Sequence, residues 1–301
     1  MKILITAPKY FDNEVVNIFK QIGEVTIKED LDNIAEYDVI VIRVNTKVDK
    51  NFLDKAMNLK VIGSATIGLD HIDVDYAKEK AIEIISLQGA NTSPTAEHVF
   101  ALLLSLVRKV NSAQISLING GWNREMFFGT QLEGKKLGIV GYGRIGQHVG
   151  KIAKGFGMEL LAYDPYLPDD KFSDAKKMEL DELLQEADFV TLHMFLSDET
   201  SGMFNINKFK LMKKESFLIN CSRGAVINDN DLVKALKQKI ISGAGLDVFC
   251  EEPLPEDNIL FKYAKKHDNL ILTPHLGALT KEAVHEAGVS IAEKIKKFLE
   301  K

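Results

Sequence analysis

Residues 138–146 read GIVGYGRIG. An apolar run at 137–140 is typical of a buried strand, and the apolar residues at 145, 149 and 152 predict that a helix follows. Gly141 would allow the tight turn, Gly143 would let the backbone approach a pyrophosphate, and Gly146 would let helix and strand pack closely. Glycines also serve turns that bind nothing. The strand and helix around them favour a dinucleotide site.

The residues after the glycines extend this interpretation. The backbone N–H groups of Arg144 and Ile145 would lie at the helix N-terminus, where phosphates bind. Asp164 follows the next apolar run, 160–163, near the place where an acid accepts hydrogen bonds from a ribose diol. The same carboxylate would repel a 2′-phosphate, which favours NAD over NADP. Alternatively, Asp164 only begins a turn before Pro165.

Composition limits the class of protein. The 301 residues carry 38 Lys and Arg against 43 Asp and Glu, a net charge of −5, so no overall basic footprint predicts nucleic-acid binding. Two cysteines and the absence of Cys/His clusters at ligand spacing predict a reducing compartment and no metal site. The longest apolar run, 99–107, is far shorter than the ~20 residues of a membrane span. With no leader pattern at the N-terminus, we expect a cytoplasmic protein that needs neither membrane nor nucleic acid.

Strand-like and helix-like segments alternate almost throughout the chain, which predicts parallel sheets covered by helices. Predicted strands of a first unit are 3–6, 25–27, 39–42, 61–64 and 82–85, separated by helices at 14–22, 51–57 and 74–80. A long helix is expected over 96–117. A second series of strands then begins, at 136–140, 160–163, 189–193, 217–220, 243–248 and 270–272. The last helix, 281–301, has no strand after it; its return to the first unit would make the second unit an insertion.

Three late segments offer acid–base chemistry. Arg223 ends a strand-like run, two acids at 251–252 precede Pro253, and His275 follows an apolar run and a proline. Carboxyl ends of parallel strands are where such sheets bind ligands. Taken singly, an exposed structural arginine and a structural histidine are the simpler interpretations.

These segments are familiar as a set. The motifs SATIGLDHID (64–73), NTSPTAEH (91–98), INCSRGAVI (219–227), GLDVFCEEP (245–253) and TPHLGALT (273–280), with the glycine stretch, resemble the D-isomer specific 2-hydroxyacid dehydrogenase family over 39–283. The resemblance implies an α/β protein with two doubly wound parallel-sheet domains. A Rossmann NAD domain, 98–278, would be inserted into a flavodoxin-like substrate domain formed by 1–97 and 279–301. It also implies a homodimer that associates through the NAD domain.

The resemblance implies the catalytic residues as well. The catalytic arginine falls on Arg223, the acid before proline on Glu252, and the histidine on His275; Glu251 is the competing acid. Arg223 would bind a 2-keto or 2-hydroxy carboxylate through its planar fork. His275 would exchange the hydroxyl proton as hydride moves to or from the nicotinamide. Glu252 would stabilise protonated His275 and raise its pKa.

Further residues are implied around the ligands. The backbone amides of Ile67 and Gly68 would bind the substrate carboxylate, and Asp247 would orient the nicotinamide amide. Cys221 and Ser222 would lie near the cofactor. Cys221 as a nucleophile is the alternative, but without an activating base nearby we expect a small buried contact.

One position departs from the family pattern. At the end of the predicted strand 189–193, the family has His-x-Pro and this chain has Phe195 in place of the proline. Phenylalanine lacks the fixed φ of proline. The loop on the adenine side is therefore expected to differ, without consequence for the chemistry.

The substrate stays open among several 2-keto acids. Segments 41–48 and 122–129 are similar to those of 3-phosphoglycerate dehydrogenases, and Arg43 or Lys47 could meet a substrate phosphate. Ser64 stands where those enzymes have a basic residue, and we expect no regulatory domain after the last helix. Glyoxylate, hydroxypyruvate and lactate are the alternatives. A different class, an NAD-sensing co-repressor, would retain the same triad but carry extra tails.

Overall fold

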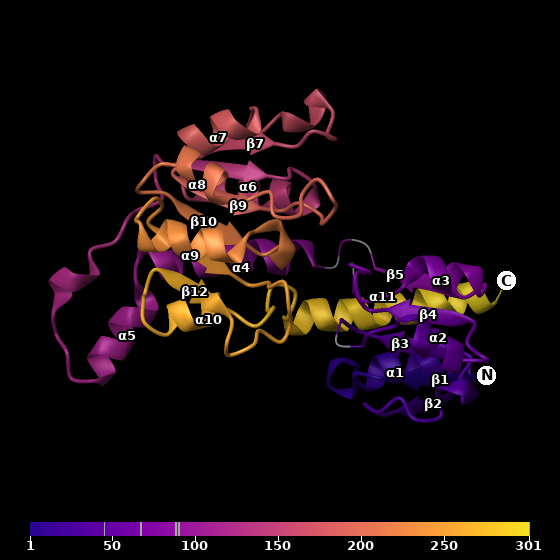
Figure 1. Cartoon of the computed structure of the whole chain (residues 1–301). Coiled ribbons are helices and arrows are strands. Elements are labelled where there is room, and N and C mark those ends of the chain that lie inside the picture. Colours follow the sequence, from indigo (N-terminus) through magenta and orange to yellow (C-terminus); the bar gives the residue numbers. More distant parts are fainter. Residues whose placement is uncertain (45, 67, 88, 90, 301) are drawn as a thin grey trace. The chain divides into compact units, whose positions relative to one another are not determined.

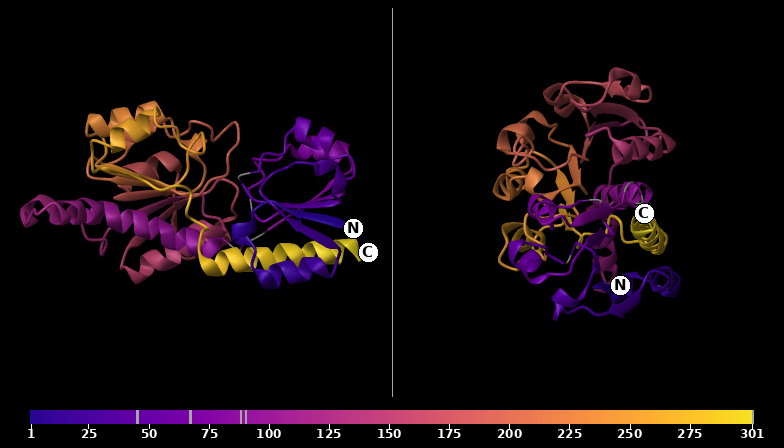
Figure 2. Two further views of the ribbon diagram at one scale, coloured as in Figure 1. Left: turned by 90° about the horizontal axis from the view of Figure 1, so that it is seen from below. Right: turned by 90° about the vertical axis from the view of Figure 1, so that its right-hand side faces the viewer.

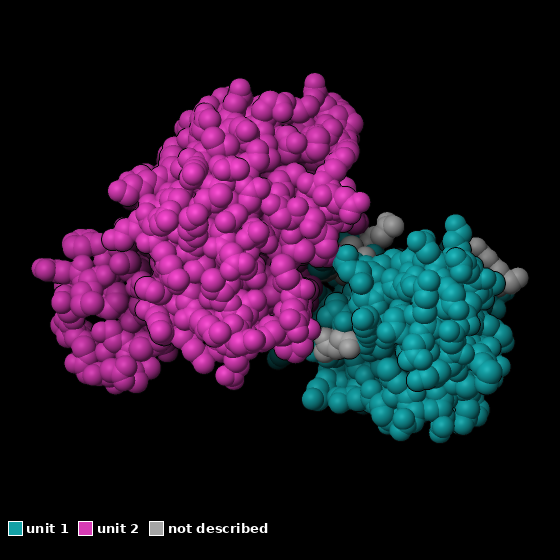
Figure 3. Space-filling view, in the orientation of Figure 1, with its two compact units in different colours: residues 1–91, 279–301 teal, residues 92–278 magenta. Residues whose placement is uncertain are grey.

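The computed structural model describes residues 1–44, 46–66, 68–87, 89 and 91–300. The chain forms two compact units, coloured separately in Figure 3: residues 1–91 with 279–301, and residues 92–278. The units separate immediately before helix α4 (Thr92–Val107), so a boundary after residue 97 would fall inside this helix. The segment 279–301 belongs to the first unit, as expected if the second unit is an insertion.

Unit 1 (1–91 with 279–301) is a parallel sheet with helices on both faces (Figure 1). Its strands, in the order β2-β1-β3-β4-β5, are β1 (Lys2–Ile5), β2 (Glu24–Ile27), β3 (Val39–Ile42), β4 (Val61–Ser64) and β5 (Glu83–Ser86). Its helices are α1 (Asn13–Lys20), α2 (Lys50–Lys55), α3 (Val74–Glu79) and α11 (Lys281–Leu299).

Successive side chains of a strand point to opposite faces of the sheet, so unit 1 has one hydrophobic core on each face. Val39 and Val41 of β3 pack towards α1 and α11, whereas Ile40 and Ile42 pack towards α2 and α3. All four are fully buried, as expected for a strand covered on both faces.

The closing helix α11 is an integral part of unit 1, and Figure 2 shows it alongside α1. Ile291 and Ile295 are fully buried, and their burial contributes roughly 1.5–3 kcal/mol each. A Cβ on Gly63 of β4 would lie 2.4 Å from the Cδ1 atom of Ile295, so glycine is needed for this close approach.

Unit 2 (92–278) is a seven-stranded parallel sheet in the order β12-β11-β10-β9-β6-β7-β8. The strands are β6 (Lys136–Val140), β7 (Glu159–Tyr163), β8 (Lys176–Lys177), β9 (Phe189–Leu192), β10 (Phe217–Asn220), β11 (Gly243–Leu246) and β12 (Leu270–Leu272). The helices are α4, α5 (Val110–Ile118), α6 (Arg144–Gly155), α7 (Leu180–Glu186), α8 (Ile206–Leu211), α9 (Asp229–Lys237) and α10 (Ile259–Ala264).

The strand order places the glycine turn where parallel sheets bind ligands. Strand β6 pairs with β7 on one side and with β9 on the other, so the direction of winding reverses at β6. Helices α4 and α6 cover one face, and α7 to α10 cover the other. The carboxyl end of β6 is therefore a topological switch point. Two doubly wound α/β units, predicted from the sequence, are confirmed.

The prediction of one long helix over 96–117 is wrong. Helix α4 ends at Val107 and α5 begins at Val110, with a bend of 57° between them. Lys109 adopts the left-handed conformation, with φ +53°, which breaks the helical path. Figures 1 and 2 show α5 reaching outwards from the body of unit 2. Among the described helices, none is by itself long and apolar enough to cross a membrane, although α4 and α5 taken together pass that test.

Candidate active site

Gly141, Gly143 and Gly146 of the 138–146 stretch have different surroundings. Gly141 has φ +90°, and a Cβ there would lie 2.7 Å from the carbonyl group of His193. A Cβ on Gly146 would lie 2.2 Å from the Gly141 carbonyl oxygen, so the helix could not approach the turn. At Gly143, a Cβ would meet no described atom within 4 Å. Gly143 thus faces open space.

The start of helix α6 fits a dinucleotide phosphate. Gly143 is the N-cap, and no side chain within the described residues caps the first turn. Arg144 and Ile145 are the first helical residues, and their N–H groups come from the helix end that carries partial positive charge. Open space at Gly143, uncapped N–H groups and a basic side chain form a donor set that suits an anion.

Asp164 is fixed against this turn. It follows β7, and its Oδ2 atom accepts a hydrogen bond from the N–H group of Tyr142 at 2.9 Å. Its Oδ1 atom accepts from the N–H group of Tyr166 at 3.0 Å. The carboxylate therefore holds the end of β7 beside the glycine turn and also begins the turn after β7. Each oxygen keeps a second lone pair for a ligand hydroxyl.

The loop after β9 is well bonded without the proline of the family pattern. Thr200 donates from Oγ1 to the carbonyl oxygen of Phe195 at 2.8 Å and accepts at Oγ1 from the Ser197 N–H group at 2.8 Å. The exposed Phe195 ring contacts the Tyr166 ring, with 5.9 Å between centroids. His193, which precedes the loop, is half-buried, and the burial of its ring lowers its pKa to about 3.

His275 and Glu252 form a close pair in unit 2. The His275 Nδ1 atom lies 2.7 Å from Glu252 Oε2, and Glu252 Oε1 accepts from the N–H group of Phe249 at 3.0 Å. The two side chains are 41% and 32% exposed, so a ligand can reach them. With Nδ1 directed at the carboxylate, Nε2 is the ring atom left for a substrate. Glu252, not Glu251, is the partner of His275.

Electrostatics favours the charged forms of both members of the pair. The hydrogen bond that His275 donates to Glu252 raises the pKa of His275 against the opposing effect of burial, and the charges of Glu252 and Asp247 add to the rise. Arg223 acts in the opposite direction. Burial acts to raise the pKa of Glu252, but hydrogen bonds from His275 and Phe249 bring it below its usual value. The pair therefore favours a protonated imidazole beside an ionised carboxylate.

Arg223 follows β10 and lies next to the loop that carries Glu252. A Cβ on Gly224 would lie only 2.0 Å from the carbonyl carbon of Phe249, so this glycine permits the two loops to touch. The Arg223 Nη1 atom donates to the Ser222 carbonyl oxygen at 2.8 Å. Asn220 holds the same turn, donating from Nδ2 to the Arg223 carbonyl oxygen at 2.9 Å.

Cys221 and Ser222 are buried between these loops and the sheet. Ser222 donates from its hydroxyl to Asn220 Oδ1 at 2.7 Å. Burial raises the pKa of the Cys221 thiol well above its ordinary value, and the charge of Asp247 adds to this effect. A protonated thiol is a poor nucleophile. Cys221 is a small packed side chain here.

Asp247 is nearly inaccessible, with 1% of its surface exposed, and its carboxylate accepts from several groups. The hydroxyl of Thr273 and the N–H group of Leu276 donate to Oδ1 at 2.6 and 2.8 Å. The N–H group of Gly277 donates to Oδ2 at 2.8 Å, and His98 Nε2 lies 3.2 Å from Oδ1. His98 and Thr273 were not predicted as site residues, although they lie in the motifs 91–98 and 273–280.

In unit 1, Arg43 and Gly68 follow the neighbouring strands β3 and β4, while Ile67 lies outside the described residues. The Arg43 guanidinium group stacks over the Tyr10 ring, 4.4 Å from its centroid. The Gly68 carbonyl oxygen accepts from the hydroxyl of Thr66 at 3.0 Å. Tyr10 gave no sequence signal, because its contact with Arg43 exists only once β1 and β3 pair.

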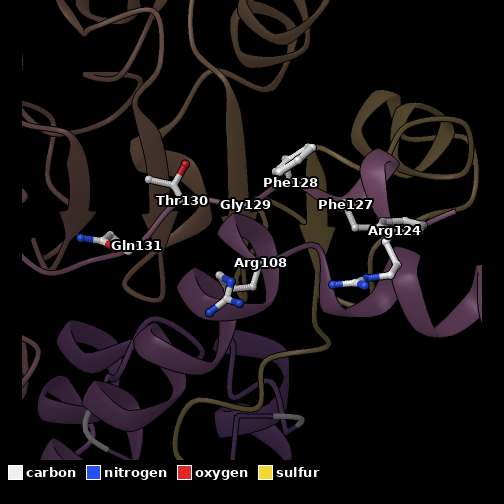
Figure 4. Close-up of a pocket in the computed structure, with 7 residues that line it drawn as sticks. All are labelled: Arg108, Arg124, Phe127, Phe128, Gly129, Thr130 and Gln131. Atoms are coloured by element: carbon white, nitrogen blue, oxygen red, sulfur yellow. The ribbon is translucent and has the colours of Figure 1, made fainter.

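A separate hollow of about 390 Å³ lies in unit 2, between the chain that follows α4 and the chain that follows α5 (Figure 4). It is lined by Arg108, which follows α4, by Arg124 and by residues 127–131, and the predicted catalytic residues are not part of it. Within the described part of the chain, no group of three or more His, Cys, Asp or Glu side chains is placed to hold a metal ion.

Comparison with known proteins identifies the family. Residues 100–277 match the D-isomer specific 2-hydroxyacid dehydrogenase, NAD binding domain, family. The chain is 42% identical to D-3-phosphoglycerate dehydrogenase of Methanocaldococcus jannaschii over 99% of its length and 57% of that protein. It is 41% identical to glyoxylate reductase of Thermococcus litoralis, covering 89% of this chain and 81% of that one.

The same fold occurs in solved structures. D-lactate dehydrogenase of Aquifex aeolicus, complexed with NAD and lactic acid, matches with a TM-score of 0.86 and 28% identity over 100% of this chain and 96% of that one. The chain spans about half the length of the phosphoglycerate dehydrogenases it matches. From its NAD-binding domain and its relatives, the chain belongs to the D-isomer specific 2-hydroxyacid dehydrogenase family.

Proposed function

We propose that the protein is an NAD-dependent oxidoreductase that interconverts a D-2-hydroxy acid and the corresponding 2-keto acid. The observation that carries this proposal is the hydrogen bond between His275 and Glu252, 2.7 Å long, in the unit that also contains the glycine turn. An NAD-sensing binding protein of the same fold is the alternative. It would bind the cofactor but show no turnover.

The nicotinamide of bound NAD supplies the site that accepts or gives hydride. In reduction of a keto acid, His275 donates the Nε2 proton to the oxygen at C2, and in oxidation it accepts the hydroxyl proton there. Glu252 holds Nδ1–H, orients the ring and stabilises its protonated form. Glu252 therefore sets the pKa at which His275 changes between acid and base.

Arg223 binds the carboxylate end of the substrate in this proposal. Arg223 offers a planar, permanently charged fork that matches a carboxylate and polarises the adjacent oxygen at C2. The backbone amides of Gly68 and Ile67 would complete the carboxylate site; the first follows β4, and the second lies outside the described residues.

The cofactor is held by the residues at the switch point. The N–H groups of Arg144 and Ile145, with open space at Gly143, would receive the pyrophosphate, while Gly141 and Gly146 keep turn and helix in place. Asp164 would accept from the ribose diol and repel the 2′-phosphate of NADP. Asp247, Cys221 and Ser222 would line the nicotinamide end.

The distal end of the substrate would meet Arg43. Stacking on the Tyr10 ring restricts the Arg43 guanidinium group. The hydroxyl oxygens of Thr6 and Thr46, in the segments that follow β1 and β3, lie 3.1 Å apart. This set suits a substrate phosphate, as in 3-phosphoglycerate; Lys47, which is exposed, is the second cation. Glyoxylate, hydroxypyruvate and lactate lack this phosphate and are the alternatives.

A screen of NADH oxidation decides between these functions and substrates. Purified protein is assayed with 3-phosphohydroxypyruvate, hydroxypyruvate, glyoxylate and pyruvate, with NADH and NADPH, beside the His275→Ala variant. We expect turnover with NADH that His275→Ala abolishes while NADH still binds. Cofactor binding with no turnover of any keto acid would favour the sensing alternative.

We infer that two copies associate through the α5 projection (α5 with residues 119–128). Large apolar side chains of this segment are exposed: Ile115, Leu117, Ile118, Trp122, Met126 and Phe128. Such a patch on one chain is typical of an interface, and a symmetric pair would cover it with the same patch of a second copy. Light scattering should give the mass of a dimer for wild type and of a monomer for the double variant Ile118→Asp, Trp122→Asp. A monomeric wild type would disprove this.

We also propose a reducing compartment, the cytoplasm, for the protein. Cys221 and Cys250 are both free thiols; Cys221 is buried and Cys250 is exposed. An exposed free thiol is typical of such compartments. Fractionation of cells that express the protein tests this assignment.

A further inference from the structure

His98 is the residue of the NTSPTAEH motif that the mechanism above leaves without a role. It lies in α4, and its side chain is only 16% exposed. Its Nε2 atom lies 3.2 Å from Asp247 Oδ1 and 3.1 Å from Thr273 Oγ1. A helix on one face of the sheet thus contacts the ends of β11 and β12, from which the loops of Glu252 and His275 depart.

The partners of His98 determine which nitrogen carries the hydrogen. Hydrogen bonds from His98, Thr273 and the Leu276 N–H group lower the pKa of Asp247 despite its burial, so Asp247 is ionised and can only accept. Thr273 uses its single hydroxyl hydrogen for Asp247, at 2.6 Å, and its oxygen can then only accept from His98. His98 Nε2 is therefore a donor, shared between the carboxylate and the hydroxyl.

The Asp247 carboxylate in turn holds the loop that carries His275. It accepts from the N–H groups of Leu276 and Gly277, and the Asp247 carbonyl oxygen accepts from the His275 N–H group at 3.0 Å. His275 has φ +54°, a left-handed conformation that a non-glycine residue adopts only when its surroundings impose it. The hydrogen bonds to Asp247 impose it here.

Close packing against α4 supports the same assignment. A Cβ on Gly277 would lie 3.1 Å from Asp247 Oδ2 and 3.5 Å from the hydroxyl oxygen of Thr95, which precedes His98 by nearly one turn of α4. The loop after β12 therefore lies between the Asp247 carboxylate and one face of α4. His98 donates to the carboxylate from that same face.

We propose that His98 is a positioning residue for the reaction: by donating to Asp247 and Thr273, it holds the 273–277 loop so that the His275 ring faces Glu252 and the substrate. The expected change in kcat rests on the proposed function, whereas the expected change in the NMR titration of His275 does not. A histidine that only fills space in the core would support folding but leave the state of the His275 ring unchanged.

The test compares His98→Gln, which keeps an N–H donor, with His98→Leu, which keeps the bulk and loses the donor. His267→Leu, an exposed position in the same unit, is the control. Histidine-labelled protein without cofactor is titrated by NMR, with the His275 signal assigned from His275→Asn. Charged groups that act on His275 are Glu252 and Asp247, which raise its pKa, and Arg223, which lowers it.

We expect the wild-type His275 to titrate above the ordinary value of about 6.5. In His98→Leu its pKa should fall towards that value, because the loop no longer holds the ring against Glu252; His98→Gln should retain most of the rise. The kcat for the best keto acid should fall by about tenfold to a hundredfold in His98→Leu, with the KM for NADH little changed. The His267→Leu control should match wild type.

An unchanged His275 titration in folded His98→Leu would overturn the proposal, even if its melting temperature falls. Should His98→Leu fail to fold, Thr273→Val replaces it, since this change removes the shared hydroxyl with little change of volume and is expected to lower the His275 pKa in the same way. If no keto acid is turned over, the proposed function fails, while the titration still decides the role of His98.

Discussion

Two histidine–carboxylate pairs in this molecule have the same length and different settings. His275 and Glu252 in unit 2 are 2.7 Å apart, and His285 and Asp12 in unit 1 are also 2.7 Å apart. Both histidines are about 40% exposed, and in both cases the hydrogen bond to the acid raises the histidine pKa. The distance and the direction of the pKa change do not distinguish them.

Their supports do distinguish them. His275 lies in a loop after a strand, with left-handed backbone imposed by the buried Asp247 carboxylate. His285 lies within the regular helix α11, and Asp12 is the N-cap of α1, accepting from the Val15 N–H group at 3.0 Å. The pair in unit 1 links helices α11 and α1. The pair in unit 2 holds the His275 ring so that its Nε2 atom is left for a substrate. An acid–base site is therefore recognised by the structure that supports the pair, because the distance within the pair is the same in both cases.

Removing each imidazole gives the largest expected contrast. His275→Ala should lower kcat for keto-acid reduction by about 10²–10⁴-fold, because the proton donor is lost, whereas His285→Ala should leave kcat unchanged. Steady-state assays of both variants, with NADH binding measured by fluorescence, check this. An equal loss of kcat in the two variants would show that the two pairs do not differ in their role in the reaction.

Neutralising each carboxylate gives a smaller contrast. Glu252→Gln removes the charge that raises the His275 pKa, so the pH at which reduction is lost should move down towards about 6.5. Reduction needs protonated His275, so its rate falls as pH rises through this pKa. The kcat near neutral pH should fall by about tenfold to a hundredfold, less than on loss of His275 itself.

Asp12→Asn is the matched control for this change, because it neutralises the other pair and still offers a capping oxygen to α1. Its pH–rate profile should coincide with that of wild type. If Glu252→Gln leaves the profile in place, the role of Glu252 in setting the His275 pKa is wrong.

Most of the fold could be predicted from the sequence, because the signals for its strands and helices are local. Alternating apolar runs predicted two doubly wound units, and the lone final helix predicted the insertion. The break between α4 and α5 could not be predicted, since Lys109 takes a left-handed conformation without a glycine, asparagine or proline to signal it. Tertiary packing outweighs local preference there.

The site was predicted less completely, because its contacts join distant residues. The resemblance placed Glu252 and His275 together, and the pair is observed. It implied a nicotinamide contact for Asp247, but it gave no sign that His98 donates to this carboxylate across a sequence separation of 149 residues. The His285–Asp12 pair, 273 residues apart, likewise required the return of α11 to unit 1.

Because Asp12 caps helix α1, its substitution is expected to change the stability of the protein and not its activity. Asp12→Ala removes the acceptor for the Val15 N–H group and should lower the free energy of unfolding by about 0.5–2 kcal/mol. Asp12→Asn should lower it less. Urea denaturation of both variants measures the difference, and a large loss of kcat in either one would contradict a purely structural pair in unit 1.

The pH dependence of stability is the smallest expected effect. The hydrogen bond to Asp12 raises the pKa of His285, so its contribution is fully present below about 6.5 and is lost as pH rises through the folded value. The Val15 N–H group and His285 lower the pKa of Asp12, so that contribution is lost as pH falls below about 4. Melting curves of wild type and His285→Gln should therefore differ most between about pH 4 and 6.5, should converge near pH 9 and, because the pair is exposed, should converge in high salt. A difference that grows above pH 7 would show that His285 acts as a neutral ring, and the two pairs would then differ in charge as well as in support.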